Sequence, residues 1–198
     1  VCEAGVTTRV SVSSSGEQGS SSFLSFPAIS ADGRYVAFES AASNLVPGDT
    51  NNDDDVFVHD RETGETTRVS VSSSGEQGNG WSDSPAISAS GRYVAFRSEA
   101  SNLDRDDTND EYDVFVHDRQ TRETTRVSVS STGQLWYTNS CCPSISADGR
   151  YVAFQTDGVG YHGVGDVFVH DRQAGQTTLV SVSSSGEPGN DWSHDPAI

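Results

Sequence analysis

Two residue types, lysine and methionine, are missing from the 198-residue sequence, so its 12 cationic side chains other than histidine are all arginines. Against them stand 29 acidic residues, and the net charge of −17 makes nucleic acid and acidic membranes unsuitable partners because they repel an anionic surface. Long apolar runs are also lacking, so we expect no membrane insertion. No signal peptide is visible. Because the chain does not start with methionine, we expect that an N-terminal segment has been removed, which leaves export open.

Cysteine is scarce as well. The sequence has three cysteines, Cys2, Cys141 and Cys142. Their odd number and the adjacency of the last two exclude a disulfide framework. Three alternatives stay open: incidental small residues, a bond from Cys2 to Cys141 or Cys142 within or between chains, or a vicinal disulfide in the adjacent pair. None of the three has the spacing of a metal site.

What the sequence does contain is a repeat. A motif of the form Gly-Arg-Tyr-Val-Ala-Phe occurs at residues 33–38, 91–96 and 149–154, with a spacing of 58 residues. The run Val-Phe-Val-His-Asp-Arg recurs at 56–61, 114–119 and 167–172. The run Thr-Thr-Arg-Val-Ser-Val-Ser occurs at 7–13, 66–72 and 124–130, and with Leu in place of Arg at 177–183. These motifs cover the whole chain and indicate a repeat architecture.

Each repeat contains four short runs with strand character, which in the first repeat are residues 27–30, 34–39, 55–59 and 66–72. Gly33 and Gly64 lie in the links and suit tight turns, because glycine accepts a positive φ. The second run is apolar on both faces, so each sheet must be covered on both sides. The sequence therefore predicts an all-β fold, a β-propeller of four-stranded antiparallel blades.

We expect one propeller segment over residues 1–198, with about three and a half repeats. The repeats span approximately 27–72, 85–130 and 143–183, with the last strand of an earlier blade at 7–13 and a partial blade at 184–198. A closed propeller normally needs four or more blades. We therefore favour a piece of a longer propeller, and the alternative is that chains join through their strand edges into a ring, tube or filament.

The order of Pro, Ser-x-Asp-Gly, Ala-Phe, Asp-Val-Phe-Val-x-Asp and Thr-Gly in these repeats resembles the TolB-type or PD40 WD40-like propeller repeat of bacterial exported proteins. The resemblance covers essentially the whole chain. It implies a propeller fold and a secreted or cell-surface location, with the periplasm as an alternative. It implies little about function, because such propellers serve as binding platforms, as lids on serine peptidases and as repeats of surface proteins.

Two acidic loops, at residues 48–55 and 106–113, carry oxygen-bearing side chains at alternate positions. Ca²⁺ binds six to eight oxygens, so we predict calcium as a cofactor, with the ligands Asp49, Asn51, Asp53 and Asp55 in the first loop and Asp107, Asn109, Glu111 and Asp113 in the second. The alternative is a solvated acidic loop that confers solubility. The third loop keeps only Asp166 of this pattern, which favours a structural role for that aspartate and for Asp55 and Asp113.

No motif for catalysis stands out. His59, His117 and His170 precede an aspartate in every repeat, but equivalent positions around a ring do not converge on one substrate, so we expect them to pack or form hydrogen bonds. A Gly-x-Ser-x-Gly elbow is absent. The variable loops between repeats carry aromatic residues that suit partner contacts, namely Trp81, Trp136, Tyr137 and Trp192. The alternative that we favour for Trp81 and Trp192 is a wedge between blades.

Together these features predict a non-catalytic, calcium-stabilised propeller scaffold, secreted or on the cell surface, that binds a protein partner or copies of itself. A first alternative is the regulatory propeller of a secreted hydrolase or peptidase. A second is a carbohydrate-binding propeller.

Overall fold

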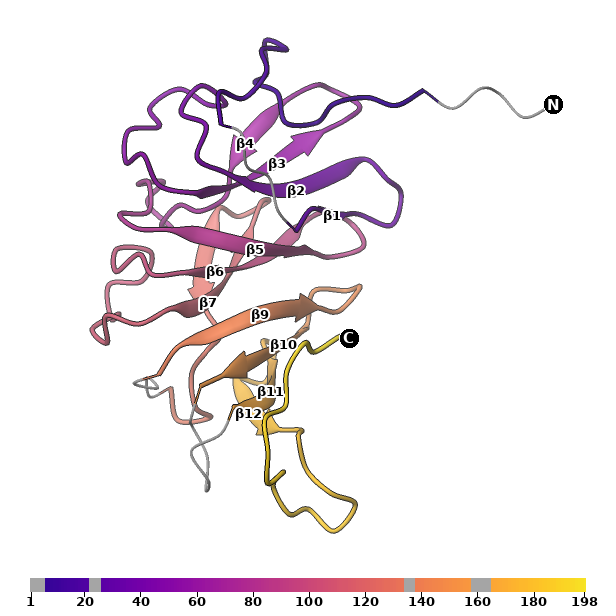
Figure 1. Cartoon of the computed structure of the whole chain (residues 1–198), viewed down its shortest axis with the longest axis vertical. Coiled ribbons are helices and arrows are strands. Elements are labelled where there is room, and N and C mark those ends of the chain that lie inside the picture. The colour runs from indigo at the N-terminus through magenta and orange to yellow at the C-terminus, as the bar shows by residue number, and fades with distance from the viewer. Residues whose placement is uncertain (1–5, 22–25, 134–137, 158–164) are drawn as a thin grey trace, which may run out of the picture.

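The computed structural model describes residues 6–21, 26–133, 138–157 and 165–198. In these ranges twelve strands form three four-stranded antiparallel sheets, each with its strands in chain order. Figure 1 shows the three sheets stacked face to face along the long axis of the molecule. The described ranges contain no helix, and hence none long and apolar enough to cross a membrane.

Each sheet is one blade of the predicted fold. The first blade contains β1 (Ala28–Ile29), β2 (Tyr35–Ser40), β3 (Asp55–Asp60) and β4 (Thr66–Arg68). The second contains β5 (Ser82–Ile87), β6 (Tyr93–Ser98), β7 (Asp113–Asp118) and β8 (Glu123–Arg126). The third contains β9 (Ser140–Ile145), β10 (Tyr151–Thr156), β11 (Asp166–Asp171) and β12 (Gln176–Leu179).

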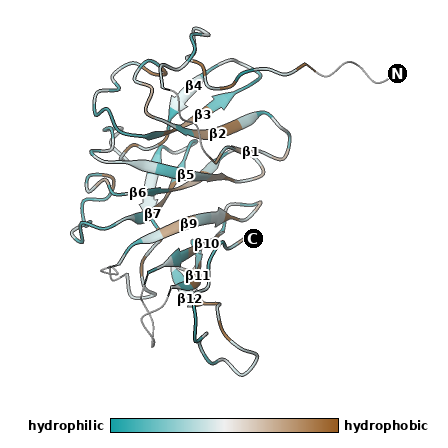
Figure 2. Ribbon diagram, in the orientation of Figure 1, coloured by the Kyte–Doolittle hydropathy of each residue, from teal (hydrophilic) through white to brown (hydrophobic). Residues whose placement is uncertain are grey.

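The hydrophobic core lies within and between the blades. In β6, Val94, Ala95 and Phe96 are consecutive and fully buried, although neighbours along a strand point to opposite faces. The two middle strands of each blade also stack a phenylalanine pair, with ring centroids 6.0 Å apart for Phe96 and Phe115. Figure 2 shows the corresponding hydrophobic stretch in β2. A blade with two apolar faces is stable only when neighbours cover both of them.

The glycine turns form as predicted. The N–H of Gly33 donates to the carbonyl of Ser30 at 2.9 Å, and Gly33 adopts a φ of 73°. Gly64 closes the turn between β3 and β4 with a φ of 77°. The second blade has Arg122 at the equivalent place, with a φ of 65°. That arginine is strained because its Cβ crowds the backbone in the left-handed region.

The fourth strand of each blade is shorter than predicted. In the first blade the expected strand at 66–72 ends at Arg68, because the chain then bends into a small hairpin closed by an isolated bridge between Val71 and Gln77. The strand expected at 7–13 is not formed. Val12 instead bridges Gln18 in the same kind of hairpin, and its carbonyl accepts a hydrogen bond from Thr66 of the first blade.

The first strands of the second and third blades start earlier than predicted, at Ser82 and Ser140, because a β-bulge interrupts them. Ser84 and Cys142 lie in these bulges with φ of 52° and 57°. The partial blade at 184–198 contains no strand, but its end follows β9, where the N–H of Ile198 donates to Ser144 Oγ at 3.2 Å.

We predict that Arg122→Gly raises the free energy of unfolding by about 1 kcal/mol, because glycine relieves the left-handed strain at an exposed turn. Urea denaturation of the purified chain measures the difference. Arg122→Ala is the matched control: it removes the same charge but keeps a Cβ, so it should leave stability unchanged. Equal effects of the two substitutions would mean that the charge, not the backbone, is responsible.

Candidate functional site

The blades meet at two equivalent joints, each made of a tyrosine, a glycine and an arginine. At the first joint, a Cβ on Gly91 would lie 2.1 Å from Cδ2 of Tyr35, so only glycine leaves room for the ring. The Arg119 guanidinium carbon lies 4.4 Å from the centroid of the Tyr35 ring. Its Nη1 also donates to the Gly91 carbonyl at 2.8 Å. The arginine therefore holds the turn of its own blade and the ring of the previous one.

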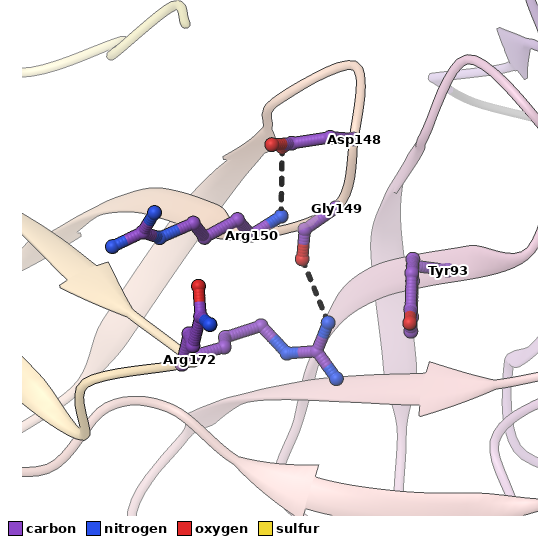
Figure 3. Close-up of a pocket in the computed structure, with 6 residues that line it drawn as sticks. Tyr93, Asp148, Gly149, Arg150 and Arg172 are labelled. Atoms are coloured by element: carbon purple, nitrogen blue, oxygen red, sulfur yellow. Dashed lines mark hydrogen bonds between the residues drawn. The ribbon is translucent and has the colours of Figure 1, made fainter.

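The second joint repeats this arrangement with Tyr93, Gly149 and Arg172, as Figure 3 shows. The corresponding Cβ would lie 2.1 Å from Tyr93, and the Arg172 guanidinium carbon lies 4.5 Å from the ring centroid. Arg172 Nη1 donates to the Gly149 carbonyl at 2.7 Å. A backbone hydrogen bond accompanies each joint, and at the second one the N–H of Ala89 donates to Ala147 at 3.0 Å.

The two outer blades carry complementary halves of a further joint. In the first blade, Arg61 Nη1 donates to the Gly33 carbonyl at 2.6 Å, as the arginines do at the joints. Within the described ranges no tyrosine of another blade lies over Arg61, and we call this pair the open socket. In the third blade, Tyr151 contacts only the guanidinium of its own neighbour Arg150, at 4.8 Å, among the described cations.

The repeated histidines hold successive blades together at another point. The hydroxyl of Thr124 donates to the carbonyl of Val71, in the hairpin of the previous blade, at 2.5 Å. Because that hydroxyl has given its hydrogen away, His117 Nδ1 donates to it at 2.9 Å. Burial lowers the pKa of His117 to about 4, so the ring is neutral at pH 7. His59 and His170 make the same bond to Thr66 and Thr177, which confirms the expected hydrogen-bonding role.

The first acidic loop closes around an arginine. Arg68 Nη1 lies 3.1 Å from Asp55 and 3.5 Å from Asp49, and both carboxylates are buried. Gln77 Nε2 donates to each of them at 3.1 Å. Burial raises the pKa of Asp55, and the hydrogen bond from Ser70 opposes that rise.

The other two predicted ligands of this loop have different partners. Asn51 Nδ2 donates to the carbonyl of Gly78 at 3.1 Å, and Asp53 accepts a hydrogen bond from the Trp81 indole at 2.8 Å. Of the four predicted ligands of this loop, only Asp49 and Asp55 therefore lie beside the same cation, the guanidinium of Arg68.

The second acidic loop has the same plan. Arg126, with 3% of its side chain exposed, lies 3.1 Å from Asp104, 3.1 Å from Asp107 and 3.2 Å from Asp113. Asn109 Nδ2 donates to Asp113 at 3.1 Å. The backbone N–H of Glu111 donates to Asn109 Oδ1 at 3.3 Å. Among the described residues, the carboxylates paired with Arg126 are those of Asp104, Asp107 and Asp113, and that of Glu111 is not one of them.

The third blade supports arginine as the partner of the acidic loops. Leu179 stands where the other blades have Arg68 and Arg126, and the loop before β11 has lost its acidic pattern. Asp166 remains, and it accepts a hydrogen bond from Ser181 at 2.8 Å, as Asp55 does from Ser70. The aspartate at the start of this strand thus has a structural role.

This arrangement does not fit a calcium ion as it stands. The described residues contain no group of three or more His, Cys, Asp or Glu side chains placed to hold a metal. A guanidinium already supplies the positive charge that the paired carboxylates need. Calcium therefore stays a prediction from the sequence.

The predicted contact residues and cysteines fall into two groups. Trp136, Tyr137 and Cys2 lie outside the described residues.

Trp81 and Trp192 are 50% and 54% exposed, and each contacts the loop before the third strand of the preceding blade, at Asp53 and Gly165 respectively. Trp81 thus reaches from its own blade to the previous one, as a wedge does, but both tryptophans keep about half of their surface in solvent. Cys141 and Cys142 are free, half-buried thiols with their Sγ atoms 2.7 Å apart.

Comparison with known proteins identifies the fold to which the three blades belong. No family model matches the sequence, and no curated protein does either. A solved structure assigned as TolB from Agrobacterium tumefaciens superposes with a TM-score of 0.52 at 17% identity, over 79% of this chain and 48% of the other. The tricorn protease superposes with a TM-score of 0.50 at 13% identity, over 75% of this chain and 13% of the other.

The chain has the fold of a partial β-propeller. The all-β prediction and the TolB-like fold are thereby confirmed, with about three blades in the described part. The chain spans less than half the length of either protein, and identities this low show the fold alone.

Sequence reasoning missed the arginines. Arg68 and Arg126 could have been found, because the change from Thr-Thr-Arg to Thr-Thr-Leu in the third repeat coincides with the loss of the acidic loop. The joints had a signal as well, since tyrosine, glycine and arginine recur at fixed places in all three repeats.

We predict that Gly91→Ala lowers the free energy of unfolding by about 2 kcal/mol more than Gly33→Ala does. Both glycines close the same turn, with φ of 72° and 73°, so the backbone strain is equal. Only at Gly91 does the new methyl group meet a tyrosine of the neighbouring blade. Chemical denaturation of the two variants gives the difference, and equal losses would show that the joint can open at no cost.

We predict that Arg126→Leu lowers the free energy of unfolding by about 3 kcal/mol or more, because it leaves buried carboxylates unpaired. Arg105→Leu is the control: this arginine lies in the same loop, its side chain is 92% exposed, and its loss should cost less than about 0.5 kcal/mol.

Thermal melts measure the effects of both arginine substitutions, and melts repeated with calcium and with a chelator test the ion. We expect the melting temperature of the unmodified chain to be the same in both. A calcium-dependent rise that Asp107→Asn abolishes would establish the site predicted from the sequence instead.

Proposed function

We propose that this chain is a non-catalytic binding and assembly scaffold, in which stacked blades present a rigid surface to protein partners or to copies of the same chain. The observation that carries the proposal is the complementarity of its two outer blades. The open socket of Gly33 and Arg61 repeats the glycine and arginine of the joints, and Tyr151 repeats their tyrosine.

The joints inside the chain indicate which contacts such a junction would use. Each joint combines a ring in van der Waals contact with a turn, a cation over that ring and a backbone hydrogen bond. At the open side, the end of the chain already lies against the third blade: the N–H of Ser193 donates to the carbonyl of Gly165, before β11, and the N–H of Ile198 donates to Ser144 Oγ in β9. An incoming blade has to displace or extend this end of the chain, so we expect weak, concentration-dependent association.

The polar residues that suggest chemistry are used in the structure itself. His59, His117 and His170 bind threonines, and the aspartates that follow the first two, Asp60 and Asp118, each form a paired hydrogen bond with an arginine. The arginine holds the pKa of Asp118 well below its usual range, so this carboxylate is not a proton donor at neutral pH. These facts support a scaffold rather than an enzyme.

An exported location is part of the proposal. It rests on the TolB-like fold, on the anionic surface and on the resemblance of the repeats to those of exported bacterial proteins. The regulatory propeller of a peptidase remains compatible with the fold, and a peptidase domain in the same gene would establish it.

Carbohydrate binding is a second candidate, because Trp81 and Trp192 expose about half of their surface on the loops between blades. Exposed indole rings suit the apolar faces of sugars. Quenching or shifting of tryptophan fluorescence by soluble oligosaccharides, lost in Trp81→Ala, is the result that would favour this function.

We predict that the weight-average mass of the purified chain rises with concentration in light scattering, and that Tyr151→Ala and Arg61→Ala each suppress the rise. Both variants remove a side chain from an outer half-joint and leave the internal joints intact. Arg105→Ala, at an exposed arginine outside the joints, should associate like the unmodified chain. A constant mass in all four proteins would rule out assembly through these blades.

A further inference from the structure

The adjacent cysteines of the third blade occupy an unusual piece of backbone. Cys141 and Cys142 lie in the β-bulge of β9, where Cys142 adopts a φ of 57° and the pairing with β10 shifts by one residue. Their Sγ atoms are 2.7 Å apart, and both side chains are half-buried, so they remain accessible to a small reagent.

The fold, not the cysteines, imposes this conformation. The equivalent residues Phe26, Ser84 and Asp195 also have positive φ, of 51°, 52° and 54°, although none of these positions has a sulfur. The left-handed residue thus recurs at this place in each repeat, and in the second and third blades it lies in a β-bulge. It places two consecutive side chains beside each other, and only in the third blade do both carry a thiol.

The neighbouring blade brings a cation to this position. Between the first and second blades, Glu39 accepts a hydrogen bond from the N–H of the bulge residue Ser84 at 2.9 Å. The residue of the second blade equivalent to Glu39 is Arg97, which binds Asp83 and lies 4.3 Å from the centroid of the Tyr112 ring. Its charge favours the thiolate form of Cys142.

The other charges around the pair are acidic. Asp83 and Asp195 act on Cys142, and Asp157 acts on Cys141, each disfavouring a thiolate. The hydrogen bond between the two thiols outweighs them: it lowers the pKa of Cys142 to about 7 and raises the pKa of Cys141. Cys142 is therefore the better nucleophile at neutral pH, and Cys141 is the resolving thiol.

We propose that Cys141 and Cys142 form a vicinal dithiol that closes to a disulfide by exchange with a small-molecule disulfide. The Cys142 thiolate attacks one sulfur of the reagent, forms a mixed disulfide and releases one thiolate. Cys141 then loses its proton to solvent and attacks Cys142 Sγ, which expels the second thiolate. The cysteines lose two electrons, the reagent gains them, and its two released thiolates take up the two protons.

Closure requires only a short approach of the two sulfur atoms. A disulfide requires its sulfurs about 2.05 Å apart, and the two Sγ atoms are already within 2.7 Å. The reaction is independent of the scaffold function proposed above, because neither residue belongs to a joint or to the open socket.

The test uses the chain with Cys2→Ser, so that only the adjacent pair carries thiols, and oxidised glutathione as the reagent. We expect both thiols to disappear at pH 7 with a loss of two hydrogens and no retained glutathione in the mass spectrum. Proteolysis should return one peptide that contains the bond between residues 141 and 142. Two retained thiols, a stable glutathione adduct or a disulfide-linked dimer would each overturn the proposal.

Single substitutions assign the roles. Cys141→Ser should trap glutathione on Cys142, because serine still donates a hydrogen bond but cannot resolve the adduct. Cys142→Ser should react at least about threefold more slowly at pH 7, as expected for a thiol of ordinary or raised pKa. Arg97→Gln, which places at this position the residue that the third blade carries as Gln155, should shift the pH profile of the reaction upward. A faster reaction of Cys142→Ser than of Cys141→Ser would reverse the assignment and contradict the proposed mechanism.

Discussion

The structure depends on one constraint, that every blade must bury both of its faces against other blades. The middle strands carry apolar side chains on both sides, as the consecutive buried residues Val94, Ala95 and Phe96 show. No blade can satisfy these faces alone, so stability is a property of the stack and not of its units. Hydrophobic burial does not by itself fix how two blades are aligned, and the joints of tyrosine, glycine and arginine do. They fix which turn of one blade meets which strand of the next, and they recur because every pair of neighbouring blades must be aligned.

This constraint explains why residues that suggest chemistry have structural partners. A histidine or aspartate repeated in every blade lies at the same buried place in each, and burial requires that its polar atoms be paired. His117 therefore donates to a threonine that is itself bound to the previous blade, and Asp113 lies against Arg126. What is left for function is the part that varies from repeat to repeat, namely the loops between strands and between blades.

The fold could be predicted from the sequence because the spacing of the repeats and the positions of the turn-forming glycines indicate the same architecture. Gly33 and Gly64 mark the turns, and the apolar runs between them have strand length. The bulges were not predictable, since Ser84 and Cys142 share no side-chain property that signals a left-handed backbone. The acidic loops were located correctly, but charge alone cannot tell whether carboxylates face a metal ion or an arginine. That depends on Arg68 and Arg126, which lie on another strand and reach the loop only after folding.

The repeated bulge also shows how one backbone can carry different chemistry at each junction. The same geometry places Glu39 at the amide of Ser84, and Arg97 within electrostatic reach of Cys142. Each pair joins two consecutive blades, so a change on one side alters the environment of the other without altering the stack. Because the joints and the buried strands hold the blades in place, these pairs are free to vary in charge and reactivity. A repeat protein of this kind can therefore differ from blade to blade in local chemistry while its architecture stays constant.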